Sequence, residues 1–356
     1  MEVIGVRIVT QPGNGLVTLG FIGAGILLGA ISGLTPGLHV NTIAVIMASV
    51  APHIPAPPHL IGASMLAAGV THSFLDVVPT LAIGVPDAAM AVSALPGHRL
   101  VMGGRGHETL RISAIGSATA VIAAAVFGVP VTLFMRALGD QVDAALPFLI
   151  VGIAVLLVAT EPGPRGKVGG ILALAASGIL GLVLLDVPAS GVLPGGDVLL
   201  PLLSGLFGVP VLVHAYYGAG VPRQGGPAIA WTRRAALGWG MVGATSGAIV
   251  AYVPGVTAAV AAAMSLVLMP TETGDREFVA TVSGVNTSNA LFGLFALVAL
   301  GTPRNGVLVA FERAKLPPNV PLLLLAMLLA AAVSFVLVPV LGDRYLRVVG
   351  SFDPRR

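Results

Sequence analysis

Long uncharged apolar stretches alternate with short clusters of charged residues along the whole chain. A helix needs about 20 apolar residues to cross the hydrocarbon core of a bilayer. The pattern therefore predicts an all-α polytopic membrane protein with about 9 to 11 membrane segments. The apolar stretches are 16–50, 60–95, 110–134, 146–160, 168–185, 198–213, 235–269, 278–300 and 322–341.

Three of these stretches, 16–50, 60–95 and 235–269, are each about 35 residues long, which is too much for one span. Pro-Gly pairs or small polar residues interrupt them. Such a stretch is typical of paired half-length helices, either broken spans or re-entrant hairpins. The stretches between 110 and 213 are shorter and nearly free of polar residues, and we interpret them as scaffold spans.

Composition excludes a water-soluble globular protein. Of 356 residues, 56% are hydrophobic and 9% are charged, where soluble domains carry about 25% charged residues. Cysteine is absent, so disulfides and thiolate metal sites are excluded. The net charge of +3 comes from short basic loops, which indicates a topology signal and no nucleic-acid partner. No cleaved signal peptide is expected, because the first residues lack a basic region and a cleavage site.

Short motifs recur in one order at nearly one spacing. Pro36-Gly37 recurs 218 residues later, 69–73 recurs at 284–288 with an offset of 215, and Gly84-Val85-Pro86 resembles Gly301-Thr302-Pro303 at 217. The recurrence predicts a two-fold repeat. Its expected parts are repeat 1 at 1–138, scaffold helices at 139–213 and repeat 2 at 214–356.

Loop charges give a partial topology. The loops at 97–111 and 214–234 are net positive and are expected in the cytoplasm. The loops at 186–197 and 270–277 are net negative and are expected on the opposite side. Basic residues flank the last apparent span at both ends, so the pattern leaves open whether the repeats are inverted or parallel.

One group of motifs resembles a known family. It comprises Gly33-Leu34-Thr35-Pro36-Gly37, then Gly84-Val85-Pro86-Asp87, and a basic loop from Gly97 to Leu110. These residues are similar to the TctA family, the large permease subunit of tripartite tricarboxylate transporters, in a shorter and divergent branch. The resemblance implies a permease that works with a small membrane subunit and a soluble binding protein.

The Pro-Gly pairs predict an anion site independently of that resemblance. Proline removes a backbone donor and glycine permits unusual dihedral angles, so a membrane helix is expected to break at each pair. A break at membrane depth survives only against protein or water, and a half-helix N-terminus suits a carboxylate or phosphate. Two breaks facing each other would form an anion site. The alternative is a pair of structural kinks.

Polar side chains near the breaks supply the candidate substrate-binding residues. They lie at the first break, at the second break, and at 286–289, which is the part of repeat 2 that matches 71–73 in repeat 1. The set is Thr35, Pro36, Gly37, His39, Asn41, Thr42, Pro254, Gly255, Thr257, Asn286, Ser288 and Asn289.

His72 and Asp76 are the candidate ion-coupling residues. They lie four residues apart inside an apolar stretch, hence on one face of a helix. Ionisable residues inside a membrane are costly and are usually functional. The alternatives are that Asp76 lies near a membrane surface, or that it only hydrogen-bonds a neighbouring helix.

These features favour a secondary active transporter of an organic anion, such as a carboxylate, coupled to Na+ or H+. The expected membrane is the plasma membrane of a prokaryote, and neither a cofactor nor a metal site is predicted. The alternative is a translocase of a lipid-linked phosphate. An enzyme acting on membrane lipid would need an acid, base or metal site that the chain does not offer beyond His72 and Asp76.

Overall fold

The computed structural model describes residues 2–3, 6–7, 15–84, 94–184, 221–226, 231–253, 258–268 and 274–351, with a few positions between 187 and 213. Its two short strands, β1 (Glu2–Val3) and β2 (Val6–Arg7), form an antiparallel pair. The other described elements are helical. They are α1 (Gly15–Leu34), α2 (Val40–Val50), η2 (Ala51–His53), α3 (Pro58–Leu75), α4 (Val77–Ile83), α5 (Ala94–Met102), α6 (Gly106–Thr160), α7 (Gly163–Leu184), α10 (Arg233–Ala251), α11 (Ala258–Leu268), α12 (Asp275–Leu300), α13 (Gly306–Arg313) and α14 (Val320–Ser351).

Among the described residues, six segments are long and apolar enough to cross a membrane. They are α1, α3 with α4, the first part of α6, α7, α12 and α14. The segments Val40–His53 and Pro147–Thr160 are apolar but shorter. The predicted all-α polytopic class is confirmed. The predicted number of segments stays a prediction, because most of 198–213 lies outside the described residues.

Glycines fix the packing of α1 on α3. The helices approach so closely that a Cβ at Gly25 would overlap the Ser64 carbonyl, and one at Gly29 would overlap that of Ala68. Small residues permit such close approach inside a membrane. The contact points advance in the same direction on both helices, so α1 and α3 run parallel.

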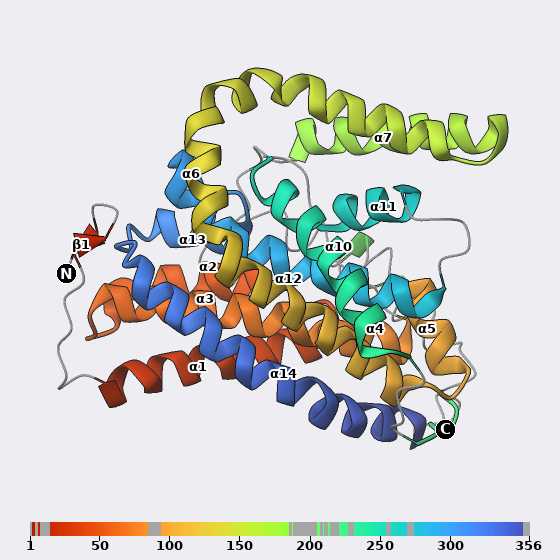
Figure 1. Ribbon diagram of the computed structural model, residues 1–356, viewed down its shortest axis with the longest axis horizontal. Helices are drawn as coiled ribbons and strands as arrows, with labels where there is room; N and C mark the ends of the chain where they lie inside the picture. The colour runs from red at the N-terminus through yellow and green to blue at the C-terminus, as the bar shows by residue number, and fades with distance from the viewer. Residues whose placement is uncertain are drawn as a thin grey trace.

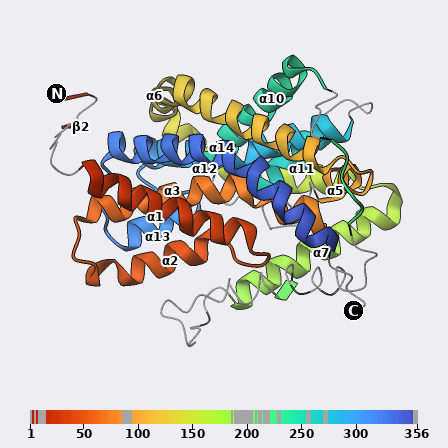
Figure 2. The same cartoon turned by 90° about the horizontal axis from the view of Figure 1, so that it is seen from below.

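A parallel pair requires the chain to return between its members. The return is made by α2, which at 1.5 Å per residue is about 16 Å long, followed by η2 and the proline-rich segment 54–57. A length of 16 Å covers about half of a 30 Å hydrocarbon core. The stretch 16–50 is therefore one full helix and one half-length helix, as Figure 2 shows for α1 and α2.

The helix bounds recur along the chain. The 11 residues of α2 return as α11 with an offset of 218, and the 26 residues 58–83 return as α12 with an offset of 217. Gly84 and Gly301, also 217 apart, both end their helix in the left-handed conformation. On α10, Gly243 and Gly247 lie against Thr281 and Val285 of α12, as Gly25 and Gly29 lie against α3.

The packing corrects the pairing of motifs read from the sequence. Gly29 contacts Thr71 on α3, and Gly247 makes the same contact with Ser288 on α12. Thr71 thus corresponds to Ser288, not to Asn286. The offset of 215 was wrong because matching letters were aligned without knowledge of which helix face packs.

Corresponding helices run in opposite directions. Gly97 of α5 touches both Leu81, near the end of α4, and Val279, near the start of α12. The start of α6 likewise meets the end of α14, where Gly106 lies against Leu346. Antiparallel corresponding helices are the hallmark of inverted repeats.

The long helix α6 leaves the bundle after its first membrane-crossing part. Its 55 residues would span about 80 Å if straight, and it carries Pro130 and Pro147 inside. Figure 1 shows α6 bending upward and then running alongside α7. Phe148 and Leu182 on this helical pair are 79% and 84% exposed, as expected of a surface that faces lipid.

One topological expectation was wrong. The loop 270–277 was placed opposite the basic loops, but Asp275 accepts hydrogen bonds from Arg99, and Arg276 pairs with Glu108. The start of α12 therefore lies at the same end as α5 and the start of α6. The positive-inside rule counts Lys and Arg and is not a net-charge rule, and the acidic residues here are partners of the basic ones.

We expect Gly29→Leu to destabilise the protein by about 1 to 3 kcal/mol, because the larger side chain forces α1 away from α3. Gly23→Leu is the matched control on the same helix, since nothing lies within 4 Å of a Cβ there. The measurement is the melting temperature in detergent. Equal melting temperatures for the two variants would contradict the close packing.

Candidate functional site

The chain breaks between α1 and α2 at the predicted Pro-Gly pair. Gly37 adopts a φ of +81°, which favours glycine. The Thr35 amide donates to the Ile31 carbonyl and the Leu38 amide donates to the Thr35 carbonyl. The next helix then begins after His39, whose Nδ1 accepts the amide of Asn41 at 3.1 Å. His39 is thus the N-cap of α2.

A second helix N-terminus meets the first. Asn305 caps α13, with its Oδ1 accepting the Leu308 amide at 3.0 Å. The Asn41 carboxamide lies directly against Gly306, the first residue of α13. The two helices thus direct the partial positive charges of their N-termini to one place.

His72 lies beside this meeting point, at the middle of the 26-residue segment 58–83. Its side chain is 3% exposed. Its Nδ1 is 3.0 Å from the hydroxyl of Ser32 on α1, and its ring centroid is 5.0 Å from that of His39. The N-terminus of α2 therefore lies at the mid-depth of α3.

Asp76 lies one turn further on, where α3 passes into α4. The backbone is interrupted here because Pro79 has no amide to donate to Leu75. Asp76 is only 2% exposed. Its Oδ2 accepts a hydrogen bond of 2.7 Å from Asn286 on α12, which also donates to the Ser73 carbonyl at 3.3 Å.

Hydroxyl groups continue the polar contacts between α12 and α6. The Thr287 hydroxyl donates to that of Ser117 and the Ser283 hydroxyl to that of Ser113, both at 2.8 Å. All four residues are buried. The buried polar groups thus extend from α1 through α3 and α12 to α6.

The predicted site residues divide into three groups. His39, Asn41, His72, Asp76 and Asn286 gather at the mid-depth of α3, with the turn residues Thr35, Pro36 and Gly37 and the half-buried Thr42 preceding or following His39. Two others lie on α12: Ser288 donates to the Ala244 carbonyl of α10, and Asn289 is half-buried. Pro254, Gly255 and Thr257 lie outside the described residues.

Sequence reasoning missed Ser32, Gly306 and Ser117. A single serine or glycine in an apolar helix carries little signal. The sequence leaves Asn305, two residues after Pro303, open as a substrate ligand or an ordinary loop residue. The available signal was a glycine shortly after a long apolar stretch, followed by a short polar segment and a new helix, which occurs at both Gly37 and Gly301.

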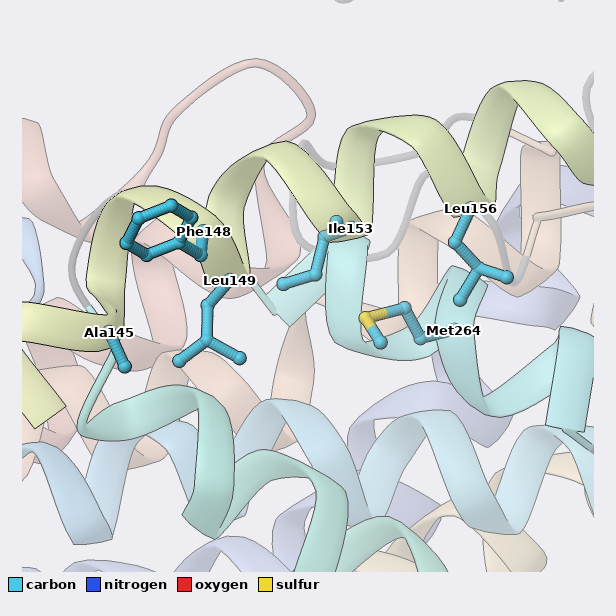
Figure 3. Close-up of a pocket in the computed structure, with 7 residues that line it drawn as sticks. Ala145, Phe148, Leu149, Ile153, Leu156 and Met264 are labelled. Atoms are coloured by element: carbon cyan, nitrogen blue, oxygen red, sulfur yellow. The ribbon is translucent and has the colours of Figure 1, made fainter.

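An apolar pocket of about 400 Å³ lies apart from the polar residues, between the outer part of α6 and α11. Figure 3 shows Phe148, Ile153 and Met264 at its walls. Each lining residue is apolar. A pocket of this kind offers nothing to orient an anion, so the polar residues of α2, α3, α12 and α13 remain the candidate site.

Residues 19–355, nearly the whole chain, match the tripartite tricarboxylate transporter TctA family. The chain belongs to the TctA family. A relative from Methanocaldococcus jannaschii, the uncharacterized protein MJ1079, is 25% identical over 334 residues, which is 90% of this chain and 79% of the relative. No solved structure matches.

Membership of this family, together with the apolar helices, makes the chain a multi-pass membrane protein of a transporter family. The polar residues at the mid-depth of α3 are therefore the candidate site, because transporters with broken helices bind substrate and coupling ions near the midplane.

We expect Asn286→Leu to destabilise the protein by about 1 to 3 kcal/mol, because it removes a donor from a buried carboxylate. Asn289→Leu, three residues further along the same helix, is the control. The double variant Asp76→Leu with Asn286→Leu should recover most of the loss, since the buried carboxylate is then removed together with this donor. Thermal unfolding in detergent measures the stability of all three variants. Equal losses of stability for Asn286→Leu and Asn289→Leu would contradict the contact of Asn286 with Asp76.

Proposed function

We propose that this protein is a secondary active transporter of a small organic anion bearing a carboxylate, coupled to Na+ or H+. The observation that carries the proposal is the meeting of two helix N-termini, from α2 and α13, beside the buried His72 and Asp76. Family membership supports transport of a tricarboxylate-type substrate.

The N-termini of α2 and α13 would bind the anion. The first amides of a helix have no partner within it, and the dipole adds about half a positive charge. Asn41 and Asn305 add carboxamide groups at the same place. Arg304 precedes the cap of α13 and is of the residue type best suited to hold a carboxylate through two hydrogen bonds.

Asp76 would bind the coupling ion. Ionisable residues inside membrane segments commonly mark the sites of ions and protons in transporters. The Ser73 carbonyl and the Thr287 hydroxyl lie nearby, at 3.5 Å from each other, and are oxygen ligands of the kind that Na+ accepts. Protonation would instead neutralise Asp76 directly.

The paired histidines supply a link between the two parts. His39 accepts the Asn41 amide through Nδ1, and this is possible only while that nitrogen carries no proton. A proton at this nitrogen would release the amide and add positive charge at the N-terminus of α2. His72 lies 5.0 Å from His39, on the helix that ends beside Asp76. A change of charge at the ion site of Asp76 would therefore alter anion binding at the N-terminus of α2.

Alternating access would come from movement of one repeat against the other. The antiparallel course of corresponding helices supports inverted repeats, for which we retain the parts 1–138 and 214–356 with the scaffold 139–213. A small membrane subunit and a soluble binding protein are the partners that the family suggests, in the plasma membrane of a prokaryote.

The first test is thermal stabilisation of the detergent-solubilised protein by di- and tricarboxylates, each with and without Na+ and across pH. At a ligand concentration of 100 Kd, binding to the folded state alone stabilises by about 2.7 kcal/mol. We expect a carboxylate to raise the melting temperature, with an ion dependence that Asp76→Asn abolishes. Glu161→Gln, in the exposed turn between α6 and α7, is the control.

Uptake into proteoliposomes under an imposed ion gradient then measures transport itself. Stabilisation by a soluble polyprenyl phosphate in place of every carboxylate would overturn the proposal in favour of lipid translocation. An ion dependence that persists in Asp76→Asn would remove Asp76 from the coupling site.

A further inference from the structure

Ion pairs join the two halves of the chain at the end of the molecule that holds α5 and the starts of α6 and α12. We call this end the basic end. Arg99 of α5 donates from two nitrogens to the carboxylate of Asp275 on α12. Glu108 of α6 has a side chain only 4% exposed and accepts from Arg276 of α12 at 2.9 Å, while Arg105 pairs with its other oxygen. These guanidinium and carboxylate groups come from α5, α6, α12 and, for Arg105, the residue immediately before α6.

A second cluster joins α6 to α14 at the same end. Arg111 donates to both oxygens of Asp343, at 3.0 and 3.3 Å, and His107 also contacts this carboxylate. The Gln224 carboxamide accepts the Gly106 amide at 2.7 Å. The start of α6 is thus held by contacts from three other parts of the chain.

The corresponding positions at the opposite end carry no such charges in the part of the chain that the structure describes. With the offset of 217, Asp275 and Arg276 correspond to Pro58 and His59. With the offset of 214 between the starts of α6 and α14, Glu108 and Arg111 correspond to Leu322 and Leu325. The contact of α13 with α3 there is Phe311 against Gly62. The two ends are therefore alike in backbone, but these positions hold ion pairs only at the basic end; the charges of Glu312, Arg313 and Lys315 at the other end stand at different positions.

We propose that these ion pairs form a latch that holds the basic end closed in the unloaded transporter. The proposal rests on the alternating access of the proposed function, in which each end must open in turn. Opening the basic end separates α5 and α6 from α12 and α14, and so leaves the nearly buried Glu108 without its partner from α12. Removing one partner of a buried pair is costly, whereas separating an apolar contact such as Phe311 against Gly62 at the other end carries no such cost.

The chain contains no cysteine, so one introduced cysteine reports on opening without background. Ser113 is suitable, because it is 1% exposed and hydrogen-bonded to Ser283 between α6 and α12, between the latch and Asn286. The rate at which a water-soluble maleimide labels Ser113→Cys then measures how often the basic end opens.

We expect Glu108→Gln and Asp343→Asn each to raise the labelling rate by about tenfold or more, since such a change in the open population reflects the lost pairing. Glu161→Gln should leave the rate unchanged. Asp275→Asn serves where a buried variant fails to fold, because Asp275 is more exposed. Asp275→Arg should increase labelling, and Arg99→Asp in the same chain should reverse the increase.

Unchanged labelling in folded variants of all three carboxylates would overturn the latch. If carboxylates still stabilise those variants, the proposed function stands without it. If the variants are labelled faster but no carboxylate stabilises the wild type, the latch is supported and the transport of carboxylates is not.

Discussion

Backbone amide and carbonyl groups without a helical partner are the main constraint on a chain inside a membrane, because lipid cannot satisfy them. The breaks before α2 and α13 meet this constraint locally. Gly37 and Gly301 take left-handed conformations, and His39 and Asn305 accept amides of the helices that follow. The surrounding long helices then keep these segments within protein. The close glycine contacts of α1 with α3, and of α10 with α12, provide this dense frame.

The sequence predicted the membrane class and the position of the first break well. Both depend on local composition, since twenty apolar residues suffice for a span and Pro36-Gly37 cannot continue a helix. The partner of that break was not predictable in the same way. The eight residues of α13 are too few for a spanning pattern, so nothing local shows that Gly306 lies against Asn41.

Side-chain pairing across helices was also hidden from sequence reasoning. The contact of Asn286 with Asp76 depends on the antiparallel register of α12 against α3, and no short motif along the chain reveals that register. The wrong side assigned to 270–277 has a similar cause. Net charge was counted along the chain, while Asp275 and Arg276 are paired in space with Arg99 and Glu108.

The duplicated backbone carries unequal chemistry. With the offset of 217, His72 corresponds to Asn289 and Asp76 to Gly293, so the ionisable pair belongs to one half only. Asn286, which holds Asp76, corresponds in turn to Gly69. In the proposed cycle, this arrangement would give one coupling site that opens to each side in turn. Both repeats contribute the same helix geometry, but only the first contributes the ionisable residues.

Helix α12 connects the two asymmetric features. It carries Asn286 at mid-depth and Arg276 at the basic end, ten residues or about 15 Å apart along the helix. A helix of this kind moves as a rigid body, so a change in the hydrogen bond to Asp76 need not pass through a chain of side chains to reach Glu108. In the proposed cycle, neutralising Asp76 weakens the hold of α3 on α12 at the point where α12 also bears half of the latch. Ion binding and opening of the basic end are then coupled, because both depend on the position of α12.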